Sequence, residues 1–269
     1  MNPNENNIQT YLMRMNELGL EPNFFTSQAY LEKAGAILYT DSASLWLVAD
    51  STPILQPIPH NGGYKACPVP FYWADFNNSQ PFPDMVPEFL DWEYIFDPKQ
   101  FTSMKGGEWA TFRKNTRKWP NRTPGWKYKD KPPVYEYEWW DLLDEWIEAK
   151  ANEIEDAEIL VKFLEDPLNN FHRKYLYNSH YELMGINVWD WNETYINYRF
   201  CIVRRNRPFL DEFMRYLFYT DPMVRAAKKK VNDGGSLGSV GLERFKDKLN
   251  PIRKRAVNSW KKIDKELRT

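Results

Sequence analysis

Residues 231–242 read Val-Asn-Asp-Gly-Gly-Ser-Leu-Gly-Ser-Val-Gly-Leu, and this stretch decides the fold expected for the second half of the chain. A β-rich run over residues 227–232 enters the loop, and a helix is predicted to begin at Val240. A strand–loop–helix junction of this kind gathers backbone N–H groups and the positive end of a helix around one small volume. That volume attracts anions and developing negative charge, so the glycine loop, residues 233–241, is the first candidate for chemistry.

Length and composition indicate a globular protein with a sizeable core. The 269 residues are 42% hydrophobic and 16% aromatic, which is enough for one large domain or two ordinary ones. A net charge of −1 gives no overall field toward nucleic acid or membrane. The N-terminal residues lack a secretory pattern, and no apolar run approaches the ~18 residues of a membrane span. We therefore expect a cytoplasmic protein without an integral membrane segment.

Cysteine and histidine usage argues against disulfides and metal. Cys67 and Cys201 form no disulfide framework, and a reducing compartment is the simplest expectation. His60, His172 and His180 have no metal-site spacing with the cysteines, so no metal site is predicted. His172 and His180 are candidate general bases, although a core or surface histidine is the simpler interpretation of each.

The near-zero net charge hides three blocks of opposite sign. Residues 105–131 hold nine basic and two acidic residues, residues 132–166 hold two basic and twelve acidic, and residues 221–269 hold fourteen basic and six acidic. Such asymmetry is typical of opposed faces. In the first block aromatic residues alternate with cations, a combination that suits phosphates and unstacked bases. The aromatic members are Trp109, Trp119, Trp126 and Tyr128. A solvated basic helix and an anionic lipid surface with Trp at the interface are the alternatives.

Hydrophobic periodicity predicts an α/β protein with a mixed sheet. The predicted helices cover residues 8–20, two apolar stripes between Asp141 and residue 164, residues 209–220, and residues 240–249. The predicted strands cover residues 36–47, 68–73, 92–96, 134–139, 182–189, 193–203, 227–232 and 253–260. Residues 190–193 form the turn of a central hairpin, and residues 172–181 are read as a connection. The order gives antiparallel strands in the middle and a late crossover.

Two segments share their spacing with a known family. The first is an aromatic strand at residues 92–97, followed by Lys105-Gly106 and by a basic helix with Arg113, Asn115 and Trp119. The second runs from residues 195–198, which end in Tyr198, through a set of spaced residues: Asn232, Gly238, Gly241-Leu242, Lys246 and Pro251. Together they resemble the phosphatidylglycerol lysyltransferase C-terminal-like family, a tandem of two units of the GNAT acyltransferase superfamily.

The resemblance implies two tandem GNAT-like units, the first degenerate. Residues 1–131 would form the first, with the basic Trp-rich segment 101–131, and residues 132–269 the second, with the glycine loop. It also implies transfer of an aminoacyl or acyl group to a hydroxyl or amine acceptor without a covalent enzyme intermediate. Relatives commonly use aminoacyl-tRNA as donor. The implied catalytic residues are Lys246, Asn232 and Ser236. The implied donor- or substrate-binding residues are Lys105, Arg113, Asn115, Trp119, Arg205, Tyr198, Gly238 and Gly241.

Two departures from the family pattern bear on activity and donor. Ser236 stands where the family usually has an acidic residue, and Asp233 could take its place. Acetyl-CoA-dependent GNAT enzymes cradle a pyrophosphate on a glycine-rich loop, whose counterpart here is Arg-Arg-Asn-Arg-Pro at residues 204–208. This stretch has no glycine, and Pro208 has no N–H. Acetyl-CoA is therefore not the expected donor and no cofactor is predicted, although the arginines could still grip a phosphate.

Several functions stay open at this point. The leading one is an aminoacyl or acyl transferase, and a variant is a phage-type amino acid:DNA transferase acting on a modified base. The alternative class is a non-catalytic GNAT-like module that binds nucleic acid, which Ser236 favours. Nucleic acid, as tRNA donor or DNA acceptor, is the expected partner, with an anionic lipid surface as the alternative. The sequence selects no amino acid, acceptor or oligomeric state, and Glu182 and Glu193 are further candidates for the base.

Overall fold

The computed structural model describes residues 2–4, 8–40, 44–48, 55, 57–59, 71–74, 85–150, 161–162, 171–236 and 238–262. The chain divides into two compact units: unit 1 holds residues 1–93 and 254–269, and unit 2 holds residues 94–253. This division differs from the one expected at residues 131 and 132, because the basic segment 101–131 lies within unit 2. Strands β6 (Met85–Phe96) and β12 (Arg253–Lys262) run along the chain from one unit into the other.

Unit 1 contains an antiparallel sheet in the order β1-β2-β3-β4. Its strands are β1 (Asn2–Asn4), β2 (Ile37–Thr40), β3 (Ser44–Val48) and β4 (Ile58–Pro59), and its helices are α1 (Ile8–Glu17) and α2 (Gln28–Lys33). Apolar side chains of the helices and the sheet form one core: Tyr11, Met15, Leu31, Leu38, Leu45, Leu47, Leu55 and Ile58. The predicted end of the first helix is confirmed, because Gly19 takes a left-handed φ of +65° just after α1.

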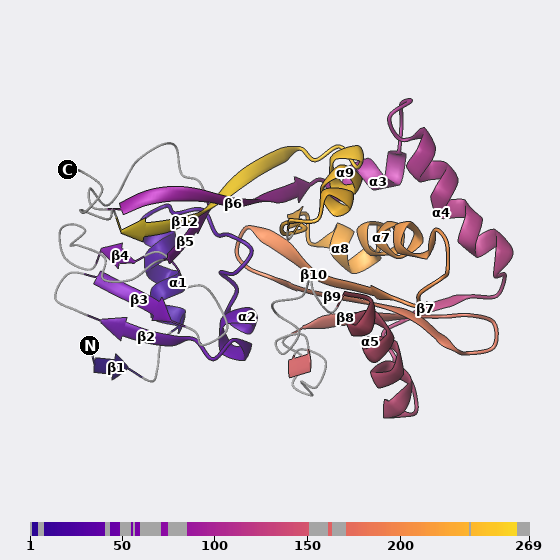
Figure 1. Ribbon diagram of the computed structural model, residues 1–269, viewed down its shortest axis with the longest axis horizontal. Helices are drawn as coiled ribbons and strands as arrows, with labels where there is room; N and C mark the ends of the chain where they lie inside the picture. Colours follow the sequence, from indigo (N-terminus) through magenta and orange to yellow (C-terminus); the bar gives the residue numbers. More distant parts are fainter. Residues whose placement is uncertain are drawn as a thin grey trace. The chain divides into compact units, whose positions relative to one another are not determined.

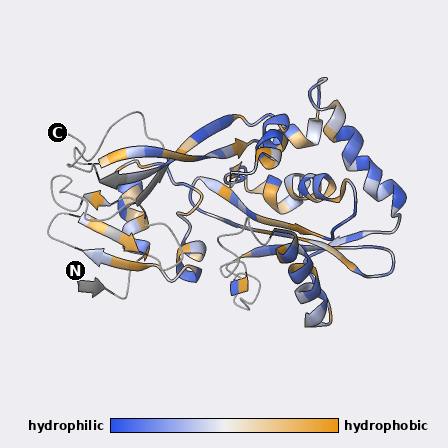
Figure 2. Ribbon diagram, viewed as in Figure 1, coloured by the Kyte–Doolittle hydropathy of each residue, from blue (hydrophilic) through white to orange (hydrophobic). Residues whose placement is uncertain are grey.

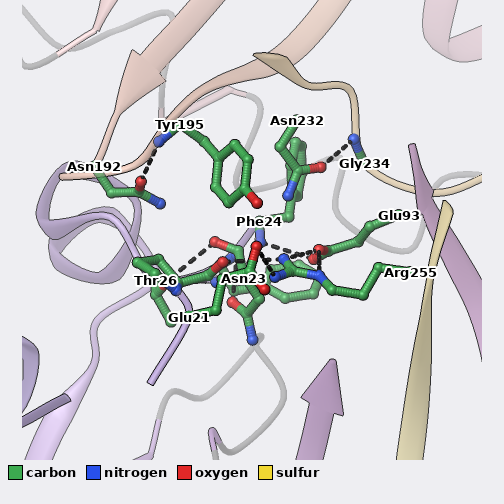
Figure 3. Close-up of polar contacts among 12 residues, drawn as sticks. Glu21, Asn23, Phe24, Thr26, Glu93, Asn192, Tyr195, Asn232, Gly234 and Arg255 are labelled. Atoms are coloured by element: carbon green, nitrogen blue, oxygen red, sulfur yellow. Dashed lines mark hydrogen bonds and ion pairs between the residues drawn. The ribbon is translucent and has the colours of Figure 1, made fainter. Parts of the chain in front are cut away.

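A second strand pair of unit 1 joins β5 (Phe71–Ala74) to β12 in antiparallel register. A buried ion pair lies on β12 and β6: Nε of Arg255 donates to Oε2 of Glu93 at 3.0 Å. The same guanidinium donates to the Pro22 carbonyl at 3.0 Å, and the Phe24 N–H donates to Glu93 at 2.8 Å (Figure 3). The pair therefore ties the segment between α1 and α2 to the two strands that leave the unit.

The sheet of unit 2 has the order β6-β11-β10-β9-β8-β7. Its further strands are β7 (Lys127–Lys129), β8 (His172–Tyr177), β9 (Leu183–Trp191), β10 (Tyr195–Val203) and β11 (Lys230–Asn232). Neighbouring strands are antiparallel except β10 and β11, which are parallel. Asn192 forms the hairpin turn, since its Oδ1 accepts the N–H groups of Thr194 and Tyr195 at 3.0 and 2.8 Å. The predicted mixed α/β sheet with a late crossover is confirmed.

Helices cover both faces of the β8–β9–β10 part of this sheet (Figure 1). On one face α7 (Leu210–Thr220) packs against α4 (Ala110–Arg122) and α3 (Pro98–Ser103), and α5 (Glu136–Lys150) lies on the other. The helices α8 (Pro222–Ala226) and α9 (Val240–Lys248) precede and follow β11. Between α4, α7 and the strands lies an apolar cluster: Trp119, Leu176, Met184, Leu210, Phe213 and Met214. Most of α4 is strongly hydrophilic (Figure 2).

Two of the predicted elements of unit 2 are wrong. Residues 134–139 were expected to form a strand, but α5 begins at Glu136. The aromatic alternation there resembles a strand pattern. Inside α5, however, Leu142, Leu143, Trp146 and Ile147 recur at the helical spacing, and Leu142 and Leu143 are buried. Asp141 lies within α5 and does not cap it. Residues 172–177 were read as a connection, yet they form β8 and pair with β9 from His172 to Tyr177.

Candidate functional site

The glycine loop is fixed at both of its ends. Where the loop leaves β11, the Asp233 N–H donates to the Tyr94 carbonyl at 2.9 Å and the Tyr94 N–H donates to the Gly234 carbonyl at 3.2 Å. The Gly234 N–H donates to Oδ1 of Asn232 at 3.0 Å (Figure 3). At the other end Ser239 caps α9, because its Oγ accepts the Leu242 N–H at 3.4 Å. The predicted helix start at Val240 is confirmed.

Asp233 is the centre of a buried cluster beneath the loop. Its Oδ2 accepts hydrogen bonds from the Arg215 guanidinium and, at 2.8 Å, from the Tyr219 hydroxyl. Its Oδ1 lies 3.1 Å from the Lys246 ammonium. Arg215 and Tyr219 are four residues apart on α7, so successive turns of one helix present both groups to the same carboxylate. We call these four side chains, all of them buried, the Asp233 cluster.

Lys246 on α9 is bound to the backbone of its own loop. Its Nζ lies 2.5 Å from the carbonyl oxygen of Asp233, 2.6 Å from that of Gly235 and 3.3 Å from that of Gly234. The ring of Tyr94 is a further neighbour, with its centroid 5.5 Å from Nζ. An ammonium has three N–H donors and no acceptor, so the carbonyls and the Asp233 carboxylate account for its donors. The side chain is 3% exposed, which leaves almost no surface for a direct contact with donor phosphate.

Two members of the Asp233 cluster, Arg215 and Tyr219, have pKa values that are shifted by their buried surroundings. Burial works to lower the pKa of Arg215, but the Asp233 carboxylate outweighs it and raises that pKa above its usual value. Burial, followed by the negative charge of Asp233, raises the pKa of the Tyr219 hydroxyl well above the usual tyrosine value. Arg215 therefore stays charged and Tyr219 stays neutral near physiological pH. This part of the cluster supplies a fixed field and no proton-transfer group.

The loop begins where two parallel strands part. β10 and β11 pair only from Tyr195↔Lys230 to Asn197↔Asn232. β10 then continues to Val203, while β11 ends and the chain turns into the glycine loop. A bulge interrupts the pairing of β10 with β9 between Tyr198 and Phe200. Bulges of this kind bend a strand and are common beside functional sites. The geometry therefore points to the volume bounded by the glycine loop and the bulged part of β10.

Tyr198, at this bulge, belongs to a buried network. Its ring stacks on Phe218 with centroids 3.8 Å apart and planes 7° apart, and its hydroxyl donates to Oδ1 of Asn187 at 2.5 Å. Nδ2 of Asn187 donates to the Tyr128 hydroxyl at 2.8 Å and to the Met214 carbonyl at 3.0 Å. Burial raises the pKa of Tyr198 well above the usual value. Tyr198 thus holds β9, β10 and α7 together with a neutral hydroxyl.

The loop between β10 and α7 lacks the features of a phosphate cradle. Nη1 of Arg204 lies 2.7 Å from Oδ2 of Asp141 and 2.9 Å from Oε2 of Glu145, so this guanidinium is paired with α5. The Arg205 N–H donates to Glu145 as well, which takes a backbone donor of the loop. Only the side chains of Arg205 and Arg207 are exposed cations here. The sequence-based expectation that all three arginines could grip a phosphate is therefore not met by Arg204.

The first turn of α7 carries carboxyl groups of its own. Asp211 and Glu212 lie there, and Oε1 of Glu212 accepts a hydrogen bond from Nδ2 of Asn115 at 3.0 Å. Burial, followed by the hydrogen bond and charge of Asp211, raises the pKa of Glu212 to about 7. A helix N-terminus normally attracts anions, but a phosphate here would meet these two groups and the missing N–H of Pro208.

The aromatic residues of the basic segment face the core. Trp119 is 4% exposed and stacks on Phe213 at 5.4 Å. Trp126 meets the same ring edge-on at 5.1 Å, and Trp109 packs edge-on against Phe101 at 5.1 Å. These rings fill the space between helices and are not presented to a nucleic-acid base. The cations of the segment, by contrast, include exposed ones: Lys105, Lys114, Arg117, Arg122, Lys129 and Lys131.

The structure brings some of the predicted site residues together and separates others. Four belong to the glycine loop or its support: Asn232, Ser236, Gly238 and Lys246. Three join α4 to neighbouring elements: Arg113, which donates to the Met104 carbonyl after α3, Asn115 and Trp119. The others are spread over β10, the loop after it, the loop after α3 and the first turn of α9: Tyr198, Arg205, Lys105 and Gly241. Arg113, Arg205 and Lys246 thus have different partners among the described residues.

Sequence reasoning missed the buried ionic residues of the sheet and α7. Arg215 and Tyr219 were not singled out, although two polar groups spaced i, i+4 among the apolar residues after the first turn of α7 were a usable signal. Asp190 and Arg199 were also missed. Nη2 of Arg199 lies 3.0 Å from Oδ2 of Asp190, and Oδ1 of Asp190 accepts Nδ2 of Asn197 at 3.0 Å. This second pair sits on β9 and β10 directly beside the parallel strand pair.

Neither a metal site nor a membrane span is found in the described part of the chain. No group of three or more His, Cys, Asp or Glu side chains there is arranged to hold a metal ion. Among the helices built from those residues, none has the length and apolar character needed to cross a bilayer.

Comparison with known proteins places this geometry in a known fold. No protein-family model and no curated protein matches the sequence. The structure of L-PGS from Bacillus licheniformis matches at a TM-score of 0.61 and 17% identity over 96% of this chain and 92% of that one. The C-terminal domain of a putative lysylphosphatidylglycerol synthetase from Agrobacterium fabrum matches at 0.57 and 10%, over 94% and 92%. A tandem GNAT protein from the clavulanic acid biosynthesis pathway matches at 0.51 and 11%, over 97% of both.

The chain has the fold of these proteins. The resemblance expected from the sequence is confirmed at the level of the fold, because the matches cover nearly all of each chain. At 10–17% identity, what these matches show is the shared architecture.

Proposed function

We propose that this chain is a GNAT-like transferase that moves an aminoacyl or other acyl group to a hydroxyl or amine acceptor. One observation carries the proposal: nearly the whole chain shares its fold with L-PGS, a putative lysylphosphatidylglycerol synthetase domain and a tandem GNAT protein. The separation of β10 and β11 beside a rigid glycine loop supports the proposal. Backbone N–H groups of such a loop would stabilise negative charge that develops beside it.

The proposed reaction is a direct acyl transfer. The lone pair of the acceptor oxygen or nitrogen attacks the donor carbonyl carbon, which forms the new bond and an oxyanion. The oxyanion then collapses, the bond to the donor oxygen breaks, and the proton lost by the acceptor reaches the leaving group. Holding donor and acceptor together contributes through effective concentration, and backbone N–H groups near the oxyanion contribute through electrostatic stabilisation. No side chain of the Asp233 cluster needs to change its protonation state in this scheme.

We propose an aminoacyl ester of tRNA as the donor in place of acetyl-CoA. The paired Arg204, the missing N–H at Pro208 and the carboxyl groups of Asp211 and Glu212 all disfavour a pyrophosphate at the start of α7. Acetyl-CoA is the competing donor to test. The structure of the tandem GNAT protein that matches this chain is one without AcCoA.

A row of cations on α4 supports a polyanionic donor. Lys114, Lys118 and Arg122 are spaced i, i+4, so they follow one another at about 6 Å along the helix. No acidic residue occurs on α4, and like charges at this spacing each cost about 0.2–0.5 kcal/mol of helix stability. Nζ of Lys118 also lies 3.8 Å from the ring centroid of Phe209, beside the loop after β10. We call these three residues the basic row.

The proposal is tested by following a labelled amino acid. Purified protein is incubated with a pool of tRNA charged with radiolabelled amino acids and with a cell extract, which is then separated into lipid, peptide and nucleic-acid fractions. Enzyme-dependent label in one fraction is the expected result, and label in DNA would identify a nucleic-acid acceptor. Lys248→Ala, a change at an exposed position of α9, should transfer label like the wild type. Label that leaves tRNA only at the spontaneous rate would refute the proposal.

A non-catalytic nucleic-acid-binding module is the second candidate. It is favoured by the burial of Lys246 and Asp233, whose side chains are engaged with each other and with the loop. It predicts salt-dependent binding of nucleic acid to the basic row without transfer of label to any fraction. The same fractionation experiment therefore separates the two candidates.

A further inference from the structure

We propose that Lys246 is a positioning residue that presets the backbone of the glycine loop for an oxyanion, and that it does not bind the donor itself. The chemical part of this inference rests on the transferase function proposed above. It differs from the role expected from the sequence, in which Lys246 contacts a donor phosphate or the reacting carbonyl.

The ammonium site is built to fit an –NH₃⁺ group. Three consecutive carbonyls converge on Nζ of Lys246, those of Asp233 at 2.5 Å, Gly234 at 3.3 Å and Gly235 at 2.6 Å. The Asp233 carboxylate is a fourth acceptor at 3.1 Å. Three tetrahedral N–H donors can be shared among these four acceptors, whereas the planar fork of a guanidinium fits them less well. A lysine is therefore required here for its shape as well as for its charge.

The carbonyl directions fix the N–H directions. No peptide bond among the described residues is cis, and in a trans peptide the C=O and the following N–H point to opposite edges of one plane. Because the Gly234 carbonyl is turned toward Lys246, the N–H of Gly235 is turned away from it. The preceding N–H, that of Gly234, is already donated to Asn232. Lys246 thus holds the Gly235 donor on the side of the loop that faces away from the Asp233 cluster.

The charge of the Asp233 cluster favours an anion on the side of the glycine loop that faces away from the cluster. Within the Asp233 cluster two cations, Arg215 and Lys246, face one carboxylate, so the four side chains carry an excess positive charge. This charge is buried, where the lower dielectric preserves its field. A cation bound to a carbonyl also polarises the peptide and strengthens its N–H as a donor. The arrangement would stabilise the oxyanion of the proposed transfer without any contact between Lys246 and substrate.

The loop is rigid enough to serve this purpose. Tyr94 on β6 pairs with Asp233 and Gly234 on one edge, Lys246 holds the carbonyls, and Arg215 and Tyr219 hold the Asp233 side chain from α7. Three separate elements therefore fix three consecutive residues. Preorganised donors of this kind need no rearrangement when charge develops.

The test removes the ammonium and then returns it as a small molecule. In folded Lys246→Ala we expect hydrogen exchange at the bonded amides of Asp233 and Gly234 to speed up by about tenfold or more, since the loop would open locally. Propylammonium chloride should restore slow exchange, while tetramethylammonium chloride, which has no N–H donor, should not. Lys248→Ala should exchange like the wild type. Unchanged exchange in Lys246→Ala, or equal rescue by both salts, would overturn the inference.

Two further readouts keep the inference testable. If Lys246→Ala does not fold, nitrogen-15 lysine NMR of the wild type should show slowly exchanging Lys246 ammonium protons, and exchange as fast as that of Lys248 would contradict it. Where transfer is measurable, Lys246→Ala should lower kcat with little change in KM, and propylammonium should restore kcat. A rise in KM alone would indicate donor binding instead. Exchange rescue without any transfer activity would uphold the positioning role and refute the proposed function.

Discussion

At the scale of single residues, the site is governed by buried charges rather than by exposed reactive groups. Asp233 was considered from the sequence as a substitute for the acid missing at Ser236. The structure gives it partners on two helices, with Arg215 and Lys246 separated from it by 18 and 13 residues in the chain. Such pairings arise from the packing of α7 and α9 and leave no local pattern, so sequence reasoning identified Lys246 but not what it binds.

Removing the Asp233 carboxylate should leave the buried charges of Arg215 and Lys246 without their counter-ion. We expect Asp233→Ala to lower the free energy of unfolding by about 3–5 kcal/mol, the cost of breaking one side of a buried ion pair. Urea denaturation measures this directly. Asp247→Asn, at an exposed position of α9, is the matched control and should lose less than about 0.5 kcal/mol. A loss for Asp233→Ala below about 1 kcal/mol, as for a surface pair, would contradict the buried cluster.

Glu212 should make stability depend on pH. Its pKa is raised from an ordinary value of 4.5 to about 7, so between these values the folded chain keeps a proton that the unfolded chain has lost. Stability should therefore fall as the pH rises from 4.5 through 7. Glu212→Gln has no proton to lose and can still accept the hydrogen bond from Asn115. Its Tm should exceed that of the wild type at pH 8 and match it near pH 4.5, and an equal gap at both pH values would disprove this assignment.

At the scale of elements, the aromatic rings and the cations of α4 have different roles, whereas the sequence suggested one shared role in binding nucleic acid. The family resemblance implied a basic helix here, and the alternation of rings and cations suggested that both would meet nucleic acid. In the structure Phe112, Thr116 and Trp119 form the buried side of α4, whereas Lys114 and Arg122 of the basic row are exposed and Lys118 is half-buried against Phe209. Composition alone could not assign the rings, because the side that faces the core is set by how α4 packs on α7. The α5 start was mistaken for a similar reason, since alternating aromatic residues suit both periods.

Trp119 should behave as a core residue. We expect Trp119→Ala to destabilise the protein by about 3–5 kcal/mol, as for other buried aromatic side chains. Arg117→Ala, on the exposed side of the same helix, should stay within about 0.5 kcal/mol of the wild type. Thermal or chemical unfolding compares the two. Trp119→Ala with wild-type stability and weakened binding of single-stranded nucleic acid would restore the stacking role.

The basic row should supply the salt-dependent part of donor binding. Changing Lys114, Lys118 and Arg122 together to Glu should weaken binding of tRNA and reduce the slope of log K against log salt by about 2–3. Fluorescence anisotropy at several salt concentrations measures both quantities. The control is a triple change of the exposed Lys129, Lys131 and Lys248 to Glu, outside α4. An equal effect of both triples would mean that only net charge matters.

At the scale of the whole molecule, the mixed sheet and most elements from β9 onward followed from periodicity and turn residues, and the fold matches that of tandem GNAT and L-PGS structures. The division into units did not follow, because β6 and β12 run from one unit into the other and no change in composition marks those points. The charge blocks of the sequence became opposite faces of unit 2, with basic α4 and acidic α5 on either side of its sheet. A polyanion would therefore be oriented toward the α4 face.

The proposed transfer of an acyl group from a donor other than acetyl-CoA can be measured directly. The most direct measurement compares initial rates of enzyme-dependent transfer from labelled aminoacyl-tRNA and from labelled acetyl-CoA, with the same extract as acceptor. We predict transfer from aminoacyl-tRNA and none above background from acetyl-CoA, because the start of α7 offers carboxyl groups where a pyrophosphate would lie. Turnover of acetyl-CoA without turnover of aminoacyl-tRNA would contradict the account.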